Sequence, residues 1–362
     1  MAHIIIAPSK YVQGAGELRN LKTYVETLGN KPLVLVSPSG MQRVRPAIEE
    51  SFGGAELVFD AFGGECCKQE IDRLCAVMEA KGCDLVIGVG GGKILDTAKA
   101  VAYYQKTPVA VVPTIASTDA PCSALSVLYT PDGVFERYLF LPANPNLVLV
   151  DTDIVSRAPA RLLVSGMGDA LATYFEAAAT AASGSATCAG GAVTTAALAL
   201  ARLCYDTLLE NGLKARLAVE QGVCTPAVEK VVEANTYLSG IGFESGGLAG
   251  AHAIHNGLTV LKACHGMYHG EKVAFGTLTQ LVLENASNEQ LDEVITFCLA
   301  VGLPVTLEDL GITDPSDEDL MAVAHAACAD GESIYNMPVP ITPEKVFAAL
   351  KAADAIGHYY KD

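Results

Sequence analysis

The stretch DLVIGVGGGKILDTAKAVAYY, residues 84–104, joins a short apolar run to a helical pattern through a run of glycines. Asp84–Val89 has the composition of a buried strand, and Ile94–Tyr104 carries apolar residues at intervals of three and four, which is typical of a helix. Glycine lets backbone N–H groups approach a phosphate closely, and the N-terminus of the following helix adds partial positive charge. Gly88–Lys93 is therefore a candidate pyrophosphate cradle.

This glycine run fits neither common phosphate-binding pattern. Lys93 stands where G-x-G-x-x-G needs a glycine, and it follows Gly88 too soon for a P-loop, with Ile94 in place of Ser or Thr. A purely structural turn therefore remains an alternative. The strand before the run and the helix after it favour the nucleotide interpretation.

The same alternation of strand and helix extends to about residue 153. Further strands are expected at Leu33–Ser37, Leu57–Phe59, Val109–Pro113 and Asn146–Asp151, and further helices at Gln42–Phe52 and Lys68–Lys81. This order predicts a parallel sheet covered by helices on both faces, with a ligand crevice at the carboxyl ends of the strands. A hairpin of Ala124–Tyr129 and Arg137–Leu141 is expected at the edge of that sheet.

After Pro159 the strand-like runs end and long Ala-rich segments follow. Helical patterns cover Ala160–Ser183, Gly190–Asn211, Lys214–Ser239, Gly247–Lys262 and Tyr268–Asn285, with breaks expected at Gly212, Gly240 and Gly302. We therefore expect two domains, an α/β dinucleotide-binding domain over residues 1–156 and an all-helical metal-binding domain over residues 157–362, with a cleft between them.

Composition and charge exclude several classes of function. The 362-residue chain is 51% hydrophobic and 18% charged, which predicts a large buried fraction, as in an α/β enzyme or an oligomer. The formal net charge of −17 repels phosphate backbones and anionic lipids, so we expect neither nucleic-acid nor membrane partners. The eleven scattered cysteines, without a CxxC pair, and the lack of a signal-peptide pattern indicate reduced thiols and a cytoplasmic protein.

Four of the seven histidines, His252, His255, His265 and His269, lie within eighteen residues. Residues three or four apart share a helix face, so each pair could project together. Imidazole is the commonest ligand for metals such as zinc, and a catalytic zinc usually takes three protein ligands. Half-buried histidines without a metal are the alternative.

A carboxylate must complete such a site, and Asp169 is the first candidate, with Glu176 and Glu244 as weaker ones. Asp169 could instead only stabilise the first turn of a helix. A second polar stretch, PTIASTDAPCS at residues 113–123, follows a predicted strand. Its hydroxyls and Asp119 would meet ribose, nicotinamide or substrate at the crevice, although a simple polar turn is also possible.

Seven blocks of sequence together resemble one enzyme family, the glycerol dehydrogenases of the iron-containing (group III) alcohol dehydrogenase superfamily. They are PSKYVQG, FGGEC, GVGGGKILDTAKA, PTIASTDAPCSA, GMGDALATYFEA, ESGGLAGAHAIHNGL and HGEKVAFGTLTQLVLEN. The similarity runs in register over nearly the whole chain. It implies a dehydroquinate synthase-like fold, with an N-terminal dinucleotide-binding domain, an all-helical C-terminal domain and one zinc ion in the cleft.

The resemblance also implies roles for individual residues. Asp169, His252 and His269 would bind zinc. Asp119 would contact the polyol substrate, and both Asp119 and His252 are expected to be catalytic residues. The cofactor would be bound by Ser37, Gly90, Gly91, Gly92, Lys93, Asp96, Thr114, Ser117, Ser123, Leu125 and Tyr129. Of these, Thr114 and the residues after it match positions that line the nicotinamide and its ribose.

The expected activity is NAD-dependent oxidation of glycerol and other vicinal diols to dihydroxyacetone and related hydroxyketones, by a homo-oligomer that could be an octamer. One departure bears on the cofactor, because Ser37 stands where the family commonly has an Asp that receives the adenine-ribose hydroxyls. An acidic residue there rejects the 2′-phosphate of NADP, and Arg43 and Arg45 follow nearby. A related polyol dehydrogenase that uses NADP is therefore the alternative. Superfamily relatives that bind phosphorylated substrates, and a nucleotide sensor without turnover, fit the residues less well.

Overall fold

The computed structural model describes all residues, 1–362, and the chain divides into two compact units. One unit comprises Ile6–Ala158 with Gly222–Cys224, and the other comprises Met1–Ile5, Pro159–Gln221 and Thr225–Asp362. The first five residues join the helical unit because the amide of Ala192 donates to the carbonyl of Ala2, over 2.7 Å.

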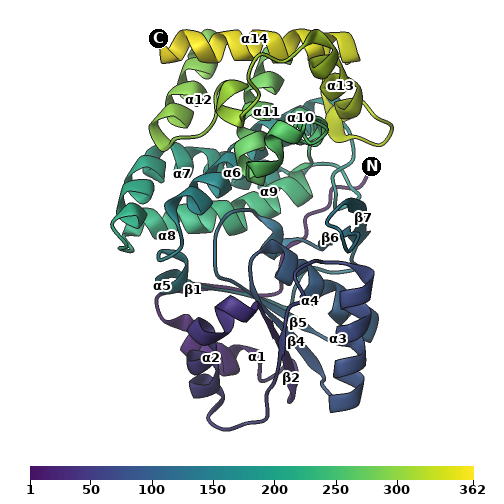
Figure 1. Cartoon of the computed structure of the whole chain (residues 1–362), viewed down its shortest axis with the longest axis vertical. Coiled ribbons are helices and arrows are strands. Elements are labelled where there is room, and N and C mark those ends of the chain that lie inside the picture. Colours follow the sequence, from purple (N-terminus) through teal and green to yellow (C-terminus); the bar gives the residue numbers. More distant parts are fainter. The chain divides into compact units, whose positions relative to one another are not determined.

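The first unit is an α/β structure (Figure 1). Its elements are β1 (Tyr11–Gly14), η1 (Glu17–Asn20), α1 (Leu21–Val25), β2 (Pro32–Val36), α2 (Pro38–Phe52), β3 (Val58–Ala61), α3 (Lys68–Lys81), β4 (Leu85–Gly90), α4 (Gly92–Gln105), β5 (Val109–Pro113), η2 (Ala120–Cys122), β6 (Leu125–Tyr129), β7 (Phe135–Phe140), β8 (Leu147–Asp151) and α5 (Thr152–Val155).

Six strands form one parallel sheet in the order β1-β8-β5-β4-β2-β3. Helices α1 and α2 lie on one face of the sheet, and α3 and α4 on the other (Figure 1). Alternate strand residues such as Val34, Ile87 and Val112 form a buried core with Ile48 of α2. On the opposite face a Cβ at Gly88 would lie 2.5 Å from Cβ of Ala98, so this glycine lets α4 pack directly on β4.

The strand order contains one point at which the direction of winding reverses. From β2 the chain goes outward to β3 and then returns across β2 to β4, so the direction of winding reverses between β2 and β4. Ligands of open α/β sheets bind outside the carboxyl ends of the strands at such a reversal. Ser37 follows β2 and Gly91 follows β4, so both lie at this point.

The second unit is helical. Its elements are α6 (Ala160–Ser183), α7 (Thr195–Glu220), α8 (Pro226–Glu233), the π-helical turn η3 (Ala234–Leu238), α9 (Ser239–Gly246), α10 (Gly250–Leu258), η4 (Lys262–Gly266), α11 (His269–Leu283), α12 (Asn288–Val301), η5 (Glu308–Leu310), α13 (Asp317–Ala327), η6 (Ser333–Asn336) and α14 (Pro343–Lys361). Helices α6, α10 and α11 pack against one another. No helix is both long enough and apolar enough to cross a bilayer.

The structure confirms the predicted fold class and corrects several details. The β6–β7 hairpin forms a separate two-stranded sheet rather than the edge of the main sheet, whose edges are β1 and β3. Strand β1 was not predicted, because YVQG has no apolar run of its own.

Two of the three predicted helix breaks are also wrong. Gly212 lies inside α7 and Gly240 inside α9, whereas Gly302 ends α12 with φ of 82°. A Cβ at Gly212 would meet the ring of Phe297 at 2.7 Å, so this glycine serves packing between helices rather than termination.

Candidate metal centre and nucleotide-binding turn

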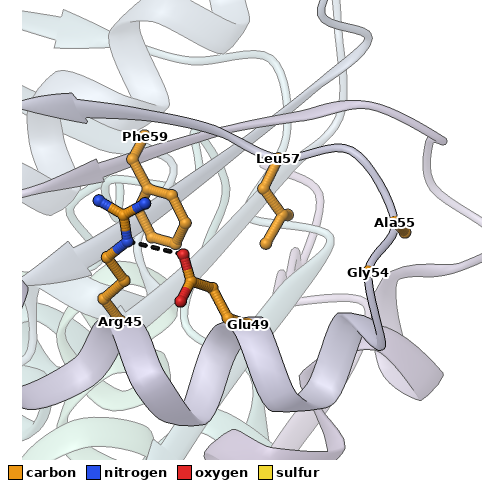
Figure 2. Close-up of a pocket in the computed structure, with 6 residues that line it drawn as sticks. All are labelled: Arg45, Glu49, Gly54, Ala55, Leu57 and Phe59. Atoms are coloured by element: carbon orange, nitrogen blue, oxygen red, sulfur yellow. Dashed lines mark hydrogen bonds and ion pairs between the residues drawn. The ribbon is translucent and has the colours of Figure 1, made fainter.

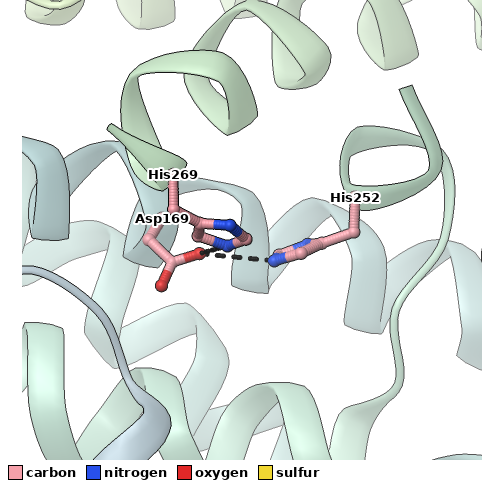
Figure 3. Close-up of side chains that lie close together, drawn as sticks. All are labelled: Asp169, His252 and His269. Atoms are coloured by element: carbon pink, nitrogen blue, oxygen red, sulfur yellow. Dashed lines mark ion pairs between the residues drawn. The ribbon is translucent and has the colours of Figure 1, made fainter. Parts of the chain in front are cut away.

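Asp169 of α6, His252 of α10 and His269 of α11 point toward one another (Figure 3). Oδ1 of Asp169 lies 3.3 Å from Nε2 of His252 and 3.1 Å from Nε2 of His269. One ligand atom from each residue lies within 4.8 Å of the others. Two neutral imidazoles and one carboxylate form a donor set that zinc and iron both accept, so these residues fit a divalent cation.

Two glycines allow these ligands to approach one another. A Cβ at Gly270, next to His269, would lie 1.7 Å from the carbonyl oxygen of Ser165, and one at Gly168, next to Asp169, would lie 2.3 Å from the carbonyl oxygen of Gly270. The N-terminus of α11 therefore touches the backbone of α6. This contact brings His269 to Asp169.

The same N-terminus is fixed by charged side chains. Glu271 accepts the backbone N–H of Tyr268 at 2.7 Å and pairs through both carboxylate oxygens with the guanidinium of Arg161, at 2.5 and 2.9 Å. The guanidinium of Arg161 also lies over the ring of Tyr268. Because Glu271 is in the first turn of α11, it stabilises the helix end that carries His269.

Glu176 orients the imidazole of His252. Its Oε2 lies 2.6 Å from Nδ1 of His252, and its Oε1 accepts the backbone N–H groups of Ala249 and His252 at 2.8 and 2.9 Å. A carboxylate on Nδ1 holds the proton there and leaves Nε2 free to bind a metal. Glu176, which the sequence offers as a weaker candidate for a metal ligand, thus contacts Nδ1 of His252, the ring nitrogen that faces away from the cluster.

The charges in the cluster favour one another. Burial by itself would raise the pKa of Asp169, but the imidazoles of His269 and His252 hold it well below the usual range. Burial would likewise lower the pKa of His252, but the carboxylates of Glu176 and Asp169 raise it well above the ordinary value. A cation that binds here therefore displaces a proton, and its affinity falls as the pH is lowered.

The other two histidines of the predicted group are not among the three converging residues: His255 lies beside them and His265 lies outside the cluster. The ring of His255 packs edge-on against that of His269, with centroids 4.2 Å apart, and its Nδ1 lies 3.1 Å from Oδ1 of Asn256. Burial lowers its pKa well below the usual value. His265 is exposed, and its Nε2 lies 3.1 Å from the carbonyl oxygen of Thr259.

The predicted pyrophosphate cradle forms the turn between β4 and α4. Gly91 is the N-cap of α4 and offers no side chain to the first helical N–H groups. A Cβ at Gly92 would meet nothing within 4 Å, so there is open space beside these donors. The uncapped helix N-terminus and this open space fit the pyrophosphate of a dinucleotide.

Lys93, at this turn, is held by neighbours from two other segments. Its Nζ lies 2.5 Å from Oε2 of Glu65 and 5.2 Å from the ring centroid of Tyr129. Burial raises the pKa of Tyr129 to about 12, so its hydroxyl keeps its proton at neutral pH. Glu65 belongs to the FGGEC block, and its contact with Lys93 joins that block to the turn.

The remaining predicted cofactor residues follow β5 or lie on α4. The backbone N–H of Thr114 donates to the carbonyl of Gly90 at 3.0 Å, which places the segment after β5 beside the glycine turn. Thr114, Ser117, Leu125 and Tyr129 are half-buried, whereas Asp119 and Ser123 are buried. Asp96 points away from the turn, because its Oδ2 accepts the N–H of Val127 and its Oδ1 pairs with Lys99.

Ser37 caps α2, since its Oγ accepts the N–H of Gly40 at 3.0 Å. Arg45 lies two turns further along α2, with its guanidinium over the ring of Phe59 and its Nε 2.7 Å from Oε1 of Glu49. Arg45, Glu49 and Phe59 border a hollow of about 290 Å³. Its other lining residues are Gly54, Ala55 and Leu57 (Figure 2). Gly54 and Ala55 precede β3, so the hollow lies toward the amino ends of the strands, away from Ser37.

The chain is similar in sequence and in structure to known proteins. Residues 8–152 match the family description "iron-containing alcohol dehydrogenase". The chain is 58% identical over 362 residues to a glycerol dehydrogenase of Pseudomonas putida and 57% identical over 362 residues to one of Escherichia coli, with 99% of both chains covered in each case. It also resembles the crystal structure of a probable glycerol dehydrogenase from Sinorhizobium meliloti 1021, with a TM-score of 0.93, 48% identity and coverage of 99% and 100% of the two chains.

The glycine contact between α6 and α11 predicts that Gly270→Ala will disrupt the cluster. The new methyl group would push the first turn of α11 away from Ser165, at a cost of about 1–3 kcal/mol for an overpacked site. We expect a lower unfolding temperature and loss of bound metal, measured by calorimetry and elemental analysis. Gly266→Ala, where a Cβ meets nothing within 4 Å, is the control. Full metal content and unchanged stability in Gly270→Ala would contradict this account.

Glu176→Gln should weaken metal binding about 10- to 100-fold, as is typical when the partner of a ligating histidine is changed. The amide nitrogen of Gln would face Nδ1 of His252 and favour the tautomer with its proton on Nε2, which cannot bind a metal. Metal affinity can be measured by competition with a chromophoric chelator. Glu284 is a half-buried carboxylate that directly follows α11 and accepts from Gln280, and Glu284→Gln should bind the metal as tightly as the unmodified protein. Equal affinity in the two variants would argue against the role of Glu176.

Proposed function

The chain belongs to the glycerol dehydrogenases of the iron-containing alcohol dehydrogenase family, and from this premise we propose that it catalyses the reversible oxidation of glycerol and other vicinal diols. The products are dihydroxyacetone and related hydroxyketones, with NAD as the hydride acceptor and one Zn²⁺ per subunit. The family implies a metal and a nicotinamide cofactor. The observation that carries the proposal is the convergence of Asp169, His252 and His269.

Zinc rather than iron is proposed for the metal, because three nitrogen and oxygen donors with an open position suit a catalytic zinc. A divalent cation at this site supplies Lewis-acid chemistry that makes the hydroxyl proton of an alcohol more acidic. Asp169 neutralises part of the cation's charge from a fully buried position. His252, oriented by Glu176, and His269 complete the ligand set and keep the imidazole Nε2 atoms directed at one point.

The α/β unit holds the cofactor in this proposal. The nicotinamide ring supplies the hydride acceptor, and the protein sets its position. Gly90, Gly91 and Gly92 with Lys93 receive the pyrophosphate, while Thr114, Ser117, Ser123, Leu125 and Tyr129 line the nicotinamide and its ribose. Asp96 acts indirectly, because its carboxylate holds the backbone of Val127. Asp119, buried at the end of the segment after β5, orients a hydroxyl group of the diol.

Two broader features of the proposal have support in the chain. All eleven cysteines are free, and burial raises the pKa of Cys66 and of Cys298 to about 12, as suits inert thiols in a cytoplasmic protein. Exposed apolar side chains on β7, among them Phe135 and Phe140, support assembly into a homo-oligomer as large as an octamer.

Use of NADP is a second candidate that one observation favours. Ser37 carries no charge at the reversal point of the sheet, so no carboxylate there opposes a 2′-phosphate. Arg45 does not add to this preference, since its guanidinium is engaged by Glu49 and Phe59. Initial rates over a panel of diols, with NAD and with NADP, decide between the two cofactors.

Removal of the metal tests the mechanism. We expect chelation, Asp169→Asn and His252→Ala each to abolish bound metal and to reduce turnover at least about a thousandfold, since Lewis-acid activation supplies several kcal/mol. Elemental analysis and the rate of nicotinamide reduction with glycerol measure both quantities. His265→Ala is the matched control, because His265 is exposed and outside the cluster. Full activity of a metal-free preparation would refute the proposal. Restoration of activity by iron but not by zinc would show that the metal is iron.

Ser37→Asp tests the cofactor preference. The added carboxylate should lower kcat/KM with NADP at least about tenfold, equivalent to about 1.4 kcal/mol, and leave kcat/KM with NAD equal or higher. Asp and Asn both cap helices well, so Ser37→Asn keeps the cap without the charge and should not change the ratio. An unchanged NADP/NAD ratio in Ser37→Asp would show that Ser37 does not face the ribose.

A further inference from the structure

We propose that Lys99 is a positioning residue for the nicotinamide end of the cofactor site, because its buried ammonium group organises residues 119–125. Lys99 lies on α4 and is 1% exposed. No functional role followed for it from the sequence, and it touches neither the glycine turn nor the metal cluster. The inference rests on the proposed function, since it concerns how the same cofactor site is built.

The ammonium group lies in a cage of oxygen atoms. Nζ of Lys99 donates to the carbonyl of Ala120 at 2.9 Å and to the carbonyl of Leu125. The carbonyl and the hydroxyl of Ser123 both lie 3.4 Å away, and Oδ1 of Asp96 lies 2.9 Å away. Three carbonyls from one short segment thus converge on a single cation.

Asp96, one turn earlier on α4, fastens the next part of the segment. Its Oδ2 accepts the backbone N–H of Val127 at 3.1 Å, and its own backbone carbonyl accepts the hydroxyl of Ser126 at 2.9 Å. Asp96 and Lys99 together bind the backbone from Ala120 to Val127. A buried pair of opposite charges contributes most where each charge is also hydrogen-bonded, as both are here.

The segment that this pair holds borders the predicted crevice. In the parallel sheet Gly90 of β4 is in register with Pro113 of β5, so the chain after β5 leaves at the same edge as the glycine turn. The N–H of Cys122 donates to the carbonyl of Asp119, which continues the held segment to Asp119. One helix, α4, therefore presents its N-terminus to the pyrophosphate and, two turns later, fixes the segment that carries Asp119 and Ser123.

Without the ammonium group the cage would not persist. The carbonyl oxygens of Ala120, Ser123 and Leu125 would face one another with no donor between them, and Asp96 would be left as a buried charge without its partner. The segment must then relax away from α4. The glycine turn itself contains none of these contacts, so the pyrophosphate half of the site should keep its geometry.

The test compares two ligands on the metal-loaded enzyme. ADP-ribose contains the pyrophosphate but no nicotinamide, whereas NAD contains both, and calorimetric titration gives a Kd for each. For Lys99→Met we expect the Kd of ADP-ribose to stay within twofold of that of the unmodified enzyme, while the Kd of NAD and the KM for glycerol each rise at least tenfold. Lys81→Met, an exposed lysine on α3, is the control and should change neither.

Chemical rescue separates positioning from general loss of stability. Lys99→Ala removes the equivalent of propylamine, so propylammonium ion should restore NAD affinity at least fivefold in a saturable manner. Tetramethylammonium ion has the same charge but no N–H donors and should restore nothing. The double variant Asp96→Asn with Lys99→Met avoids a lone buried charge, and it should show the same split between the two ligands if the single variants do not fold.

An equal loss of ADP-ribose and NAD affinity in the folded variants would overturn the inference, as would unchanged NAD affinity or the absence of rescue by propylammonium. Failure of the proposed function has a different signature. It would appear in the unmodified protein as no glycerol-dependent reduction of the nicotinamide, whereas failure of the Lys99 inference appears only in the ratio of the two affinities between variant and unmodified protein.

Discussion

The contact between the backbones of α6 and α11 is the constraint on which the cluster of Asp169, His252 and His269 depends. Because Gly168 and Gly270 lack side chains, the first turn of α11 reaches the carbonyl groups of α6 directly. Asp169 and His269 are the neighbours of these glycines in sequence, so the close approach of the helices also brings these two candidate ligands together. The pair of Arg161 and Glu271 then fixes the helix end that carries His269.

In the α/β unit, helix α4 links several parts of the predicted cofactor site. Helix α4 begins in the glycine turn, packs on β4 through Gly88, and carries the buried pair of Asp96 and Lys99. Each of these features needs a different face or end of the same helix. Its sequence is correspondingly constrained, since Ile94–Ala102 is buried throughout. A shift of α4 along its axis would disturb the glycine turn and residues 119–125 together.

The sequence predicts the architecture well where local signals are strong. Helices α3 and α6 begin and end at the predicted residues, because their apolar periodicity is clear and Gly82 and Gly184 follow them in the left-handed conformation. Where a glycine packs against another helix, as Gly212 does against Phe297, the same signal misleads. The hairpin was assigned to the wrong sheet because β-strand patterns do not specify their partners.

The candidate site residues also differ in how well the sequence predicts them. Residue types and spacing bring forward a group of four histidines with Asp169 as the first of three carboxylates, since metal ligands are polar residues in an otherwise apolar segment. The choice of His252 and His269 within that group follows only from the family resemblance. Lys99 gave no such signal, because most of its partners are backbone carbonyls, whose positions the residue types do not reveal. Glu176 was noticed for its charge, but only its distance to Nδ1 of His252 shows that it orients a ligand.

The electrostatics of the cluster explain how its charged and polar groups can be buried together. A buried carboxylate with no partner would be very unfavourable, yet Asp169 is stabilised by two imidazoles, and His252 by two carboxylates. Gly168 and Gly270 let the backbones of α6 and α11 approach, and Glu176 holds His252, so the three candidate ligands stay at short range.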